Sequence, residues 1–319
     1  MLYTARIQNS LGDEITLNDK ENKWVVTDIS GLNPAPGTIN LTECAGINGA
    51  IFNSARIGYK NIVVTLELTG NVEKNRHELY RYFRVAEPCR FFYKNEGRDV
   101  FIDGVIENAE CGPFTQKEML QASIICPIPF FSGVELKTAT LKREYVREEI
   151  MTEEWIVITT EAGTDLITED KERNIDAKVA FPFSVEIGEP VEYSVLKSSI
   201  SGYLTNAGDT DTGIVITIEV KETCEDIRIT NETTGKSIEL TLHRFLAGDV
   251  ITIDTRPTKK KIVLLRSGEE QLIFGSLTND SELFQLQPGE NGLSYTVDAE
   301  SNSHKCLITV EYRDQFKGV

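Results

Sequence analysis

The sequence predicts a mainly β protein with two domains. Short apolar runs alternate with polar residues at a period of two in both halves of the chain, and turns rich in Gly and Asn separate these runs at regular spacing. One stretch shows a helical period instead. A length of 319 residues fits about two domains, and 40% hydrophobic residues suffice for packed cores.

Residues 61–70 predict the first clear strand, half-buried, because apolar and polar side chains alternate there: Ile62, Val64, Leu66 and Leu68 against Thr65, Glu67 and Thr69. The period then changes, and one helical stripe is formed by Leu79, Tyr82, Phe83 and Ala86. Asn71 suits the N-cap of this helix. Because proline disfavours the α region for the residue before it, we expect the helix to end at Glu87-Pro88.

Strands resume at residues 89–94. The next five residues, NEGRD, predict a hairpin turn in which Gly97 adopts positive φ. Two further strands are predicted at residues 100–111 and 118–131. The first domain, residues 1–133, is therefore expected to be a sheet with one helix crossing between two of its strands.

Residues 134–180 are rich in Glu and Asp, with short alternating pieces such as EWIVITTE and TDLITED. Blocks of one charge mark solvated or projecting segments. We expect a linker that carries an exposed hairpin, and Trp155 then fills the core of that hairpin or serves as an exposed contact residue.

The second domain, residues 181–319, is predicted to be a β-sandwich of short strands separated by Gly and Asn turns. In the hairpin around the turn NETTG, Gly235 supplies the left-handed position, and Ile227 and Ile229 face Ile238, Leu240 and Leu242. In the strand VITIDT, Ile251 and Ile253 are expected to point inward, with Thr252 and Asp254 outward.

The composition excludes several classes of function. A net charge of −17 opposes a surface that tracks phosphates, because nucleic-acid affinity comes largely from Lys and Arg. No stretch approaches the ~20 apolar residues of a membrane helix, and the N-terminus lacks a secretory signal. We therefore expect synthesis and folding in a cytosol.

No local motif predicts catalysis, a cofactor or a metal ion, so no residue is assigned to such a site. The six cysteines, Cys44, Cys89, Cys111, Cys126, Cys224 and Cys306, lack C-x-x-C spacing and are expected to be free and mostly buried, with a metal or redox role as the alternative. The segment GDTDTG, with Asp209 and Asp211, lacks the glutamate that a calcium loop requires, and we interpret it as a loop entering a strand.

Segments from both halves resemble the distal tail protein family of siphophages. In the first half they are ISGLNPAPGTINL, INGAIFNSARIGYKNIVVTLELTG, RFFYKNEGRDVFIDGVIENAE and MLQASIICPIPFFSG. In the second half they are LTNAGDTDTGIVITIEV, ITNETTGKSIEL, LAGDVITIDT and FQLQPGENGL. The resemblance covers most of the chain, in the family's order, apart from about residues 134–178.

The resemblance implies a fold and a function. The first domain would be a tail-tube-like split β-barrel or sheet that closes a hexameric ring, and the second a galectin-like sandwich on the outside of the ring. The ring would join the tail tube to a fibre or lysin hub at the virion tail tip, would let DNA pass through its lumen, and would have no enzymatic activity. Receptor-binding proteins are possible further partners, and the acidic segment is then an arm that grips an adhesion protein or a longer linker. For the ring contacts we single out residues 61–70, the helix after them and residues 100–110.

Two other functions stay open at the level of sequence. The first is a carbohydrate-binding module for surface adhesion, for which the second domain offers these aromatic candidates: Tyr193, Tyr203, Phe245, Phe274, Phe284, Tyr295, Tyr312 and Phe316. Most of them sit in strand patterns typical of a core. The second is a glycoside hydrolase with two carboxylates, although no pair of acids points to it.

Overall fold

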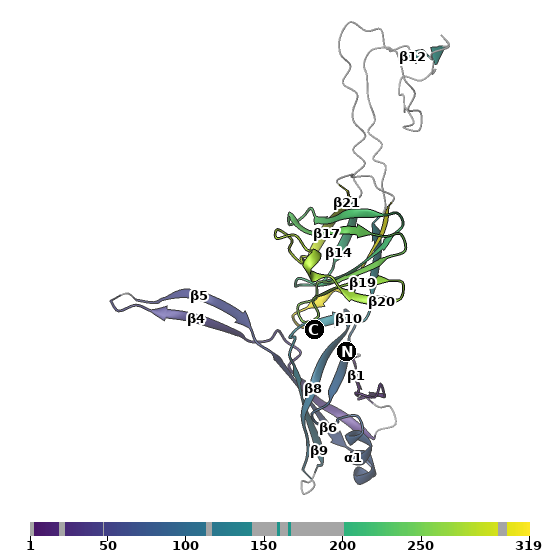
Figure 1. Cartoon of the computed structure of the whole chain (residues 1–319). Helices are drawn as coiled ribbons and strands as arrows, with labels where there is room; N and C mark the ends of the chain where they lie inside the picture. Colours follow the sequence, from purple (N-terminus) through teal and green to yellow (C-terminus); the bar gives the residue numbers. More distant parts are fainter. Residues whose placement is uncertain are drawn as a thin grey trace.

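The computed structural model describes residues 3–18, 23–46, 48–112, 117–141, 158–159, 165–166, 201–298 and 305–319. These residues form two β units, each around its own hydrophobic core, and a thin two-stranded arm that projects from the first unit (Figure 1). The mainly β fold class predicted from the sequence is confirmed, with a helix in the first unit and a sandwich in the second.

The first unit is built on one sheet in which the strands run in the order β2-β1-β7-β8-β9-β6-β3, while β10 pairs with β8 and with β23. Its strands are β1 (Thr4–Gln8), β2 (Glu14–Thr16), β3 (Trp24–Ser30), β6 (Lys60–Leu68), β7 (Pro88–Lys94), β8 (Asp99–Cys111), β9 (Met119–Cys126), β10 (Phe131–Gly133) and β23 (Gln315–Phe316). The chain reaches this sheet again at its C-terminal end, because β23 comes after the whole second unit.

The alternation predicted for residues 61–70 is confirmed in β6. Ile62, Val64, Leu66 and Leu68 are all buried in the core, and the residues between them are exposed or half-buried. Strand β6 pairs with β9 on one side and β3 on the other, so both of its hydrogen-bonding edges are occupied inside the sheet.

Helix α1 (Val72–Tyr80) begins as predicted but ends earlier. The Asn71 side chain accepts a hydrogen bond from the Lys74 amide at 3.2 Å, which satisfies one of the free N–H groups of the first turn. The helix stops at Tyr80 rather than at Glu87, because the chain must turn back to the sheet. Ala86 takes a positive φ of 63° and its amide donates to the carbonyl of Ile106, which a continuing helix would prevent.

The β7–β8 hairpin is confirmed, but its turn works differently from the prediction. Gly97 does not adopt positive φ. Instead the Asn95 side chain accepts hydrogen bonds from the amides of Gly97 and Arg98, at 2.9 and 2.8 Å. An Asx turn therefore replaces the glycine turn that the sequence suggested.

The second unit is a sandwich of two antiparallel sheets. One sheet has the order β11-β22-β15-β18-β19-β20 and contains β11 (Lys137–Leu141), β15 (Ile214–Val220), β18 (Val250–Asp254), β19 (Lys261–Arg266), β20 (Glu269–Leu272) and β22 (Cys306–Tyr312). The other has the order β14-β21-β16-β17 and contains β14 (Ser201–Asn206), β16 (Cys224–Asn231), β17 (Lys236–Phe245) and β21 (Gly289–Val297). A short 3-10 helix, η1 (Phe274–Ser276), follows β20.

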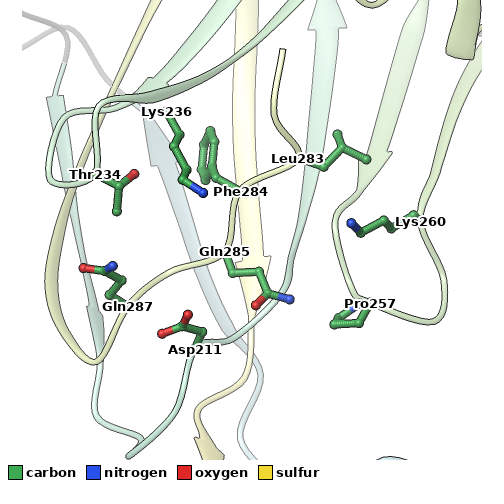
Figure 2. A pocket seen from close by; sticks show the side chains of 9 residues that line it. All are labelled: Asp211, Thr234, Lys236, Pro257, Lys260, Leu283, Phe284, Gln285 and Gln287. Carbon is green, nitrogen blue, oxygen red and sulfur yellow. The ribbon is translucent and has the colours of Figure 1, made fainter. Parts of the chain in front are cut away.

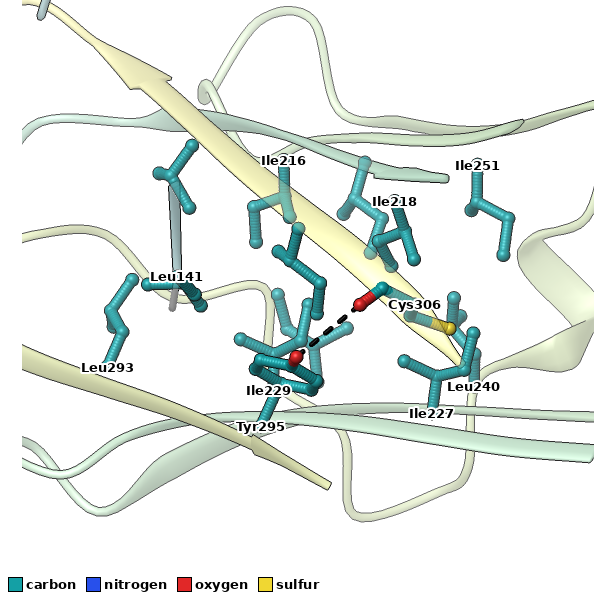
Figure 3. Packing of buried hydrophobic residues seen from close by; sticks show 14 of the residues in the cluster. Leu141, Ile216, Ile218, Ile227, Ile229, Leu240, Ile251, Leu293, Tyr295 and Cys306 are labelled. Atoms are coloured by element: carbon teal, nitrogen blue, oxygen red, sulfur yellow. Dashed lines mark hydrogen bonds between the residues drawn. The ribbon is translucent and has the colours of Figure 1, made fainter. Parts of the chain in front are cut away.

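The sandwich core forms where the apolar faces of the two sheets meet. Figure 3 shows Ile216 and Ile218 from one sheet and Ile227, Ile229 and Leu240 from the other in this core. The predicted register is confirmed, since Ile227 lies opposite Leu240 and Ile229 opposite Ile238. Gly235 has the predicted left-handed φ of 69°.

One prediction for β18 is wrong. Ile251 and Ile253 are buried as expected, but Asp254 is also buried rather than facing solvent. Its carboxylate accepts two hydrogen bonds from the Arg256 guanidinium, at 2.9 and 2.5 Å, and a third from the Arg256 amide at 3.0 Å. Because the charge is paired and hydrogen-bonded, burial is tolerated at a position that alternation assigns to the surface.

Part of the predicted linker belongs to the sandwich, because Lys137–Leu141 forms β11 and pairs with β22. Within the predicted exposed hairpin, β12 (Ile158–Thr159) pairs antiparallel with β13 (Asp165–Leu166). The rest of the acidic segment, Trp155 and Tyr193 lie outside the described residues.

Candidate assembly surface

A two-stranded arm is the most exposed element of the first unit. Strands β4 (Gly37–Glu43) and β5 (Ala50–Ile57) pair with each other and, in the part of the chain that the structure describes, with no other strand, and all of their residues are exposed. Figure 1 shows the arm extending well away from both cores. The sequence pattern predicts no strand or helix for these residues.

The arm has one apolar face. The side chains of residues directly opposite each other on paired strands point to the same face of the sheet. Along β4, successive side chains point to opposite faces. The pairs Ile39–Ala55, Leu41–Phe52 and Gly37–Ile57 therefore share one face. The exposed fractions on this face are large: Ile39 61%, Leu41 57%, Phe52 62% and Ile57 45%.

The opposite face is held together by polar side chains, although it also carries Ile51. The side-chain amide of Asn40 donates to the Ser54 hydroxyl at 2.8 Å, and the side-chain amide of Asn53 donates to the Thr42 hydroxyl at 2.6 Å. Asn53 is the extra residue of a β-bulge between the pairs Asn40–Ser54 and Leu41–Phe52. Since a shift of one residue exchanges the faces of a strand, this bulge places Phe52 on the apolar face.

The base of the arm is fixed by a close approach of two strands. Gly31, directly after β3, has a φ of 84°, and a Cβ atom there would lie 2.0 Å from the carbonyl oxygen of Asn61. Only glycine fits such a position. The arm is therefore a long, exposed element on a rigid root.

Lys60, the first residue of β6, follows the arm closely in the chain and is buried with 2% of its surface exposed. Its ammonium group donates to the carbonyl oxygens of Asn33 at 2.8 Å and Lys317 at 2.9 Å, and lies 4.4 Å from the centre of the Phe131 ring. Burial lowers the pKa of Lys60 to about 8, although Cys126 and Asp209 oppose this shift. One side chain thus joins the arm root, β10 and the C-terminal end.

The segment GDTDTG receives the C-terminal end of the chain. The Asp209 carboxylate accepts a hydrogen bond from the Lys317 amide at 2.6 Å and lies 3.7 Å from the Arg98 guanidinium of the first unit. A Cβ atom on Gly208 would lie 2.1 Å from the carbonyl oxygen of Gln315. The motif is therefore a structural junction between the two units, a role that no local sequence signal predicts.

A second surface of interest is the side of the first sheet opposite its core. Val25 on β3, Val105 on β8 and Met119 on β9 are exposed there, with exposed fractions between 38% and 47%. Val25 and Met119 lie in one row, because both pair with Glu67 of β6 from opposite sides. The strands singled out for ring contacts, β6 and β8, thus contribute to an outer face, while their hydrogen-bonding edges are occupied within the chain.

The sandwich contains a shallow pocket of about 310 Å³ (Figure 2), lined mostly by polar side chains from several loops: Asp211, Thr234, Lys236, Pro257, Lys260, Leu283, Phe284, Gln285 and Gln287. Its aromatic residue, Phe284, is only 2% exposed. A buried ring presents no face for a sugar to stack on, so the pocket offers hydrogen bonds without a stacking platform.

The other aromatic candidates for sugar binding are divided between core and surface. Phe245, Tyr295 and Tyr312 are buried, while Tyr203 and Phe274 are exposed by 66% and 45%. Neither of the exposed rings lines the pocket. The exposed aromatic rings and the polar side chains of the pocket therefore do not form one sugar-binding surface.

The described residues contain no cluster of three His, Cys, Asp or Glu side chains suited to a metal ion. In the same part of the chain no helix has the length and apolar character needed to span a bilayer.

Comparison with known proteins identifies relatives of the second unit and of the whole fold. Residues 207–316 match the family described as the siphovirus-type tail component, C-terminal domain. No curated protein matches the chain.

Two solved structures share the fold. The crystal structure of the Dit protein of phage SPP1, described as a paradigm of the hub adsorption apparatus in phages that infect Gram-positive bacteria, has 13% sequence identity and a TM-score of 0.61, covering 99% of this chain and 100% of that one. A chain of the phage P2 baseplate in its activated conformation with Ca has 12% identity and a TM-score of 0.52, covering 100% of each chain. The resemblance to siphophage distal tail proteins predicted from the sequence is confirmed.

Proposed function

We propose that this chain is a structural protein of a siphophage virion, a distal tail hub whose subunits close into a ring of six. The observation that carries the proposal is the arm, an exposed two-stranded sheet with one apolar face. Burying a large aliphatic or aromatic side chain is worth about 1.5–3 kcal/mol, so four such residues favour a protein partner over water.

The partner that fits is a second copy of the chain. A ring with rotational symmetry requires two different surfaces that match each other on neighbouring subunits. The apolar face of the arm supplies one of them. The outer face of the first sheet supplies the other, with Val25 and Met119 in one row and Val105 six residues farther along the strands.

The remaining parts of the proposal follow from the same assignment. The ring would connect the tail tube protein above to a tail-associated fibre or lysin hub below at the virion tail tip, with receptor-binding proteins as further partners. Its lumen would let DNA pass, and the net charge of −17 agrees with a surface that does not hold DNA. Synthesis would occur in the cytoplasm of the bacterial host.

We assign no enzymatic activity, cofactor or metal to the chain in this role. We propose residues 1–133 as the ring-forming domain and residues 181–319 as the sandwich domain, with two exceptions: β11 belongs to the sandwich, and β23 belongs to the sheet of the first unit. Residues 134–180 were predicted to join them as a linker or projecting arm. Because β11 is part of the sandwich, we place the start of any projecting segment after Leu141.

The test is the oligomeric state of the purified chain and of two charge-matched variants. Wild-type protein should show a species of about six times the 35.7 kDa subunit in light scattering, and a ring in electron micrographs. Leu41→Asp with Phe52→Asp places two carboxylates on the apolar face and should abolish this species. Thr38→Asp with Ile51→Asp adds the same charge to the opposite face, at exposed residues outside the Asn40–Ser54 and Asn53–Thr42 hydrogen bonds, and should leave the ring intact.

A wild-type chain that stays monomeric at high concentration and in the presence of its tail tube protein would contradict the proposal. Equal loss of assembly in both variants would assign the effect to charge alone rather than to the apolar face.

A further inference from the structure

The sandwich contains two free thiols that face each other across its two sheets. Cys224 begins β16 in one sheet and Cys306 begins β22 in the other, and their sulfur atoms lie 4.0 Å apart. Both residues are buried, with exposed fractions of 2% and 5%. The separation is that of two thiols in contact, about twice the length of a disulfide bond.

The contact makes the two thiols unequal. Either thiol can donate in this contact. When Cys306 donates, the hydrogen bond lowers the pKa of Cys224, because it stabilises the thiolate. The same hydrogen bond, together with burial, raises the pKa of Cys306. The contact allows either sulfur to attack first, and the lowered pKa of Cys224 favours its thiolate as the first nucleophile.

We propose that Cys224 and Cys306 are a site of oxidation that forms an inter-sheet disulfide, with a low-molecular-weight disulfide as the oxidant. The Cys224 thiolate attacks one sulfur of the small disulfide and releases one small thiolate. Cys306 then loses its proton and attacks the Cys224 sulfur of the mixed disulfide, which releases the second small thiolate. The two cysteines lose two electrons and two protons, and the small disulfide is reduced to two thiols.

This bond would link strands that are 82 positions apart in the sequence and would tie the two sheets together at one end of the sandwich. A cross-link over so long a loop removes much conformational freedom from the unfolded chain. The bond would stay open in a reducing cytosol and close outside the cell. That the protein reaches the outside of the cell rests on the proposed function in a released virion. The formation of the disulfide itself does not depend on that function.

The first unit supplies an internal control. Cys89 of β7 and Cys126 of β9 are also buried, but β8 lies between their strands. Gly104 of β8 pairs with Cys89, and a Cβ atom on it would lie 3.0 Å from the Cys126 sulfur. Two strand spacings amount to about 9.5 Å, beyond the ~7 Å between Cα atoms that a disulfide allows. Burial also raises the pKa of both thiols to about 12.

The experiment uses the full chain with Cys44→Ser and Cys111→Ser, which removes the two partly exposed thiols and leaves the two buried pairs. The protein is treated with oxidised glutathione at pH 8, in one arm while folded and in the other during refolding from the reduced, denatured state. It is then unfolded, alkylated with N-ethylmaleimide and analysed by intact mass and peptide mapping.

We expect two alkylated cysteines, a peptide linking Cys224 to Cys306, and a thermal midpoint raised by about 10 °C relative to the reduced protein. Adding Cys306→Ala should leave no intramolecular link and no response of the thermal midpoint to the oxidant.

Four alkylated cysteines after both the folded and the refolding treatment would overturn the proposal, as would a link that includes Cys89 or Cys126. The measurement on the chain with both buried pairs decides the question even if the alanine variant fails to fold.

Discussion

At the scale of single residues, the buried ammonium of Lys60 has the clearest consequence. Its pKa is lowered from 10.5 to about 8 by burial, so the folded state binds the proton more weakly than the unfolded chain does. Between pH 8 and 10.5 the unfolded state therefore carries more protons, and the stability contributed by this residue rises with pH in that window.

A pH titration of stability tests this assignment. The free energy of unfolding, from urea denaturation, should rise between pH 8 and 10 by up to about 3 kcal/mol more in the wild type than in Lys60→Met. The difference between the two proteins is the informative quantity, because Cys89 and Cys126 titrate in both and act in the opposite direction. Parallel curves for the two proteins would contradict a lowered pKa at Lys60.

Residue-level prediction from the sequence succeeded where the cause is local. The N-cap Asn71 and the left-handed Gly235 depend on their own few neighbours, and both are confirmed. Asp254 was assigned to the surface because alternation says nothing about Arg256 covering it. The roles of Asp209 and Lys60 depend on the C-terminal end, more than 100 positions away, so no pattern in the sequence could reveal them.

At the scale of elements, the strands of the two cores were predictable and the arm was not. A half-buried strand shows its period because one face is apolar and the other polar, as in β6. The arm also has an apolar face, but the bulge at Asn53 breaks the alternation along β5. Helix α1 was predicted too long for a related reason, since the apolar residues after Tyr80 pack on the core without being helical.

The C-terminal strand β23 gives a prediction at this scale. It pairs with β10, and the residues after it provide acceptors for Lys60 and Arg98. Removal of residues 315–319 should lower the thermal midpoint of the first unit and split one calorimetric transition into two, because the two cores lose their shared strand pairing. Lys317→Ala is the matched control: its side chain is exposed and the backbone contacts are kept, so it should behave as wild type. A single unshifted transition after truncation would show that β23 does not couple the units.

At the scale of the whole molecule, the net charge of −17 on each copy of the chain opposes closure of the proposed ring. If apolar surface drives ring closure, salt screens the repulsion and leaves the attraction. The fraction of protein in the ring, measured by sedimentation velocity at fixed concentration, should rise between about 20 and 300 mM NaCl, where the Debye length falls from roughly 20 to 6 Å. A fall over this range would instead indicate an interface held by ion pairs.

The contact between β11 and β14 has a consequence for which segments of the chain can be replaced. Leu141 is the last residue of β11 and Ser201 is the first residue of β14, and a Cβ atom on Gly202 would lie 2.7 Å from the Leu141 side chain. The end of β11 and the start of β14 therefore lie next to each other in the sandwich. When two strand ends lie next to each other, the segment that joins them can be replaced without changing the pairing of the strands. We therefore expect the sandwich to accept segments of different length and sequence between these two strand ends.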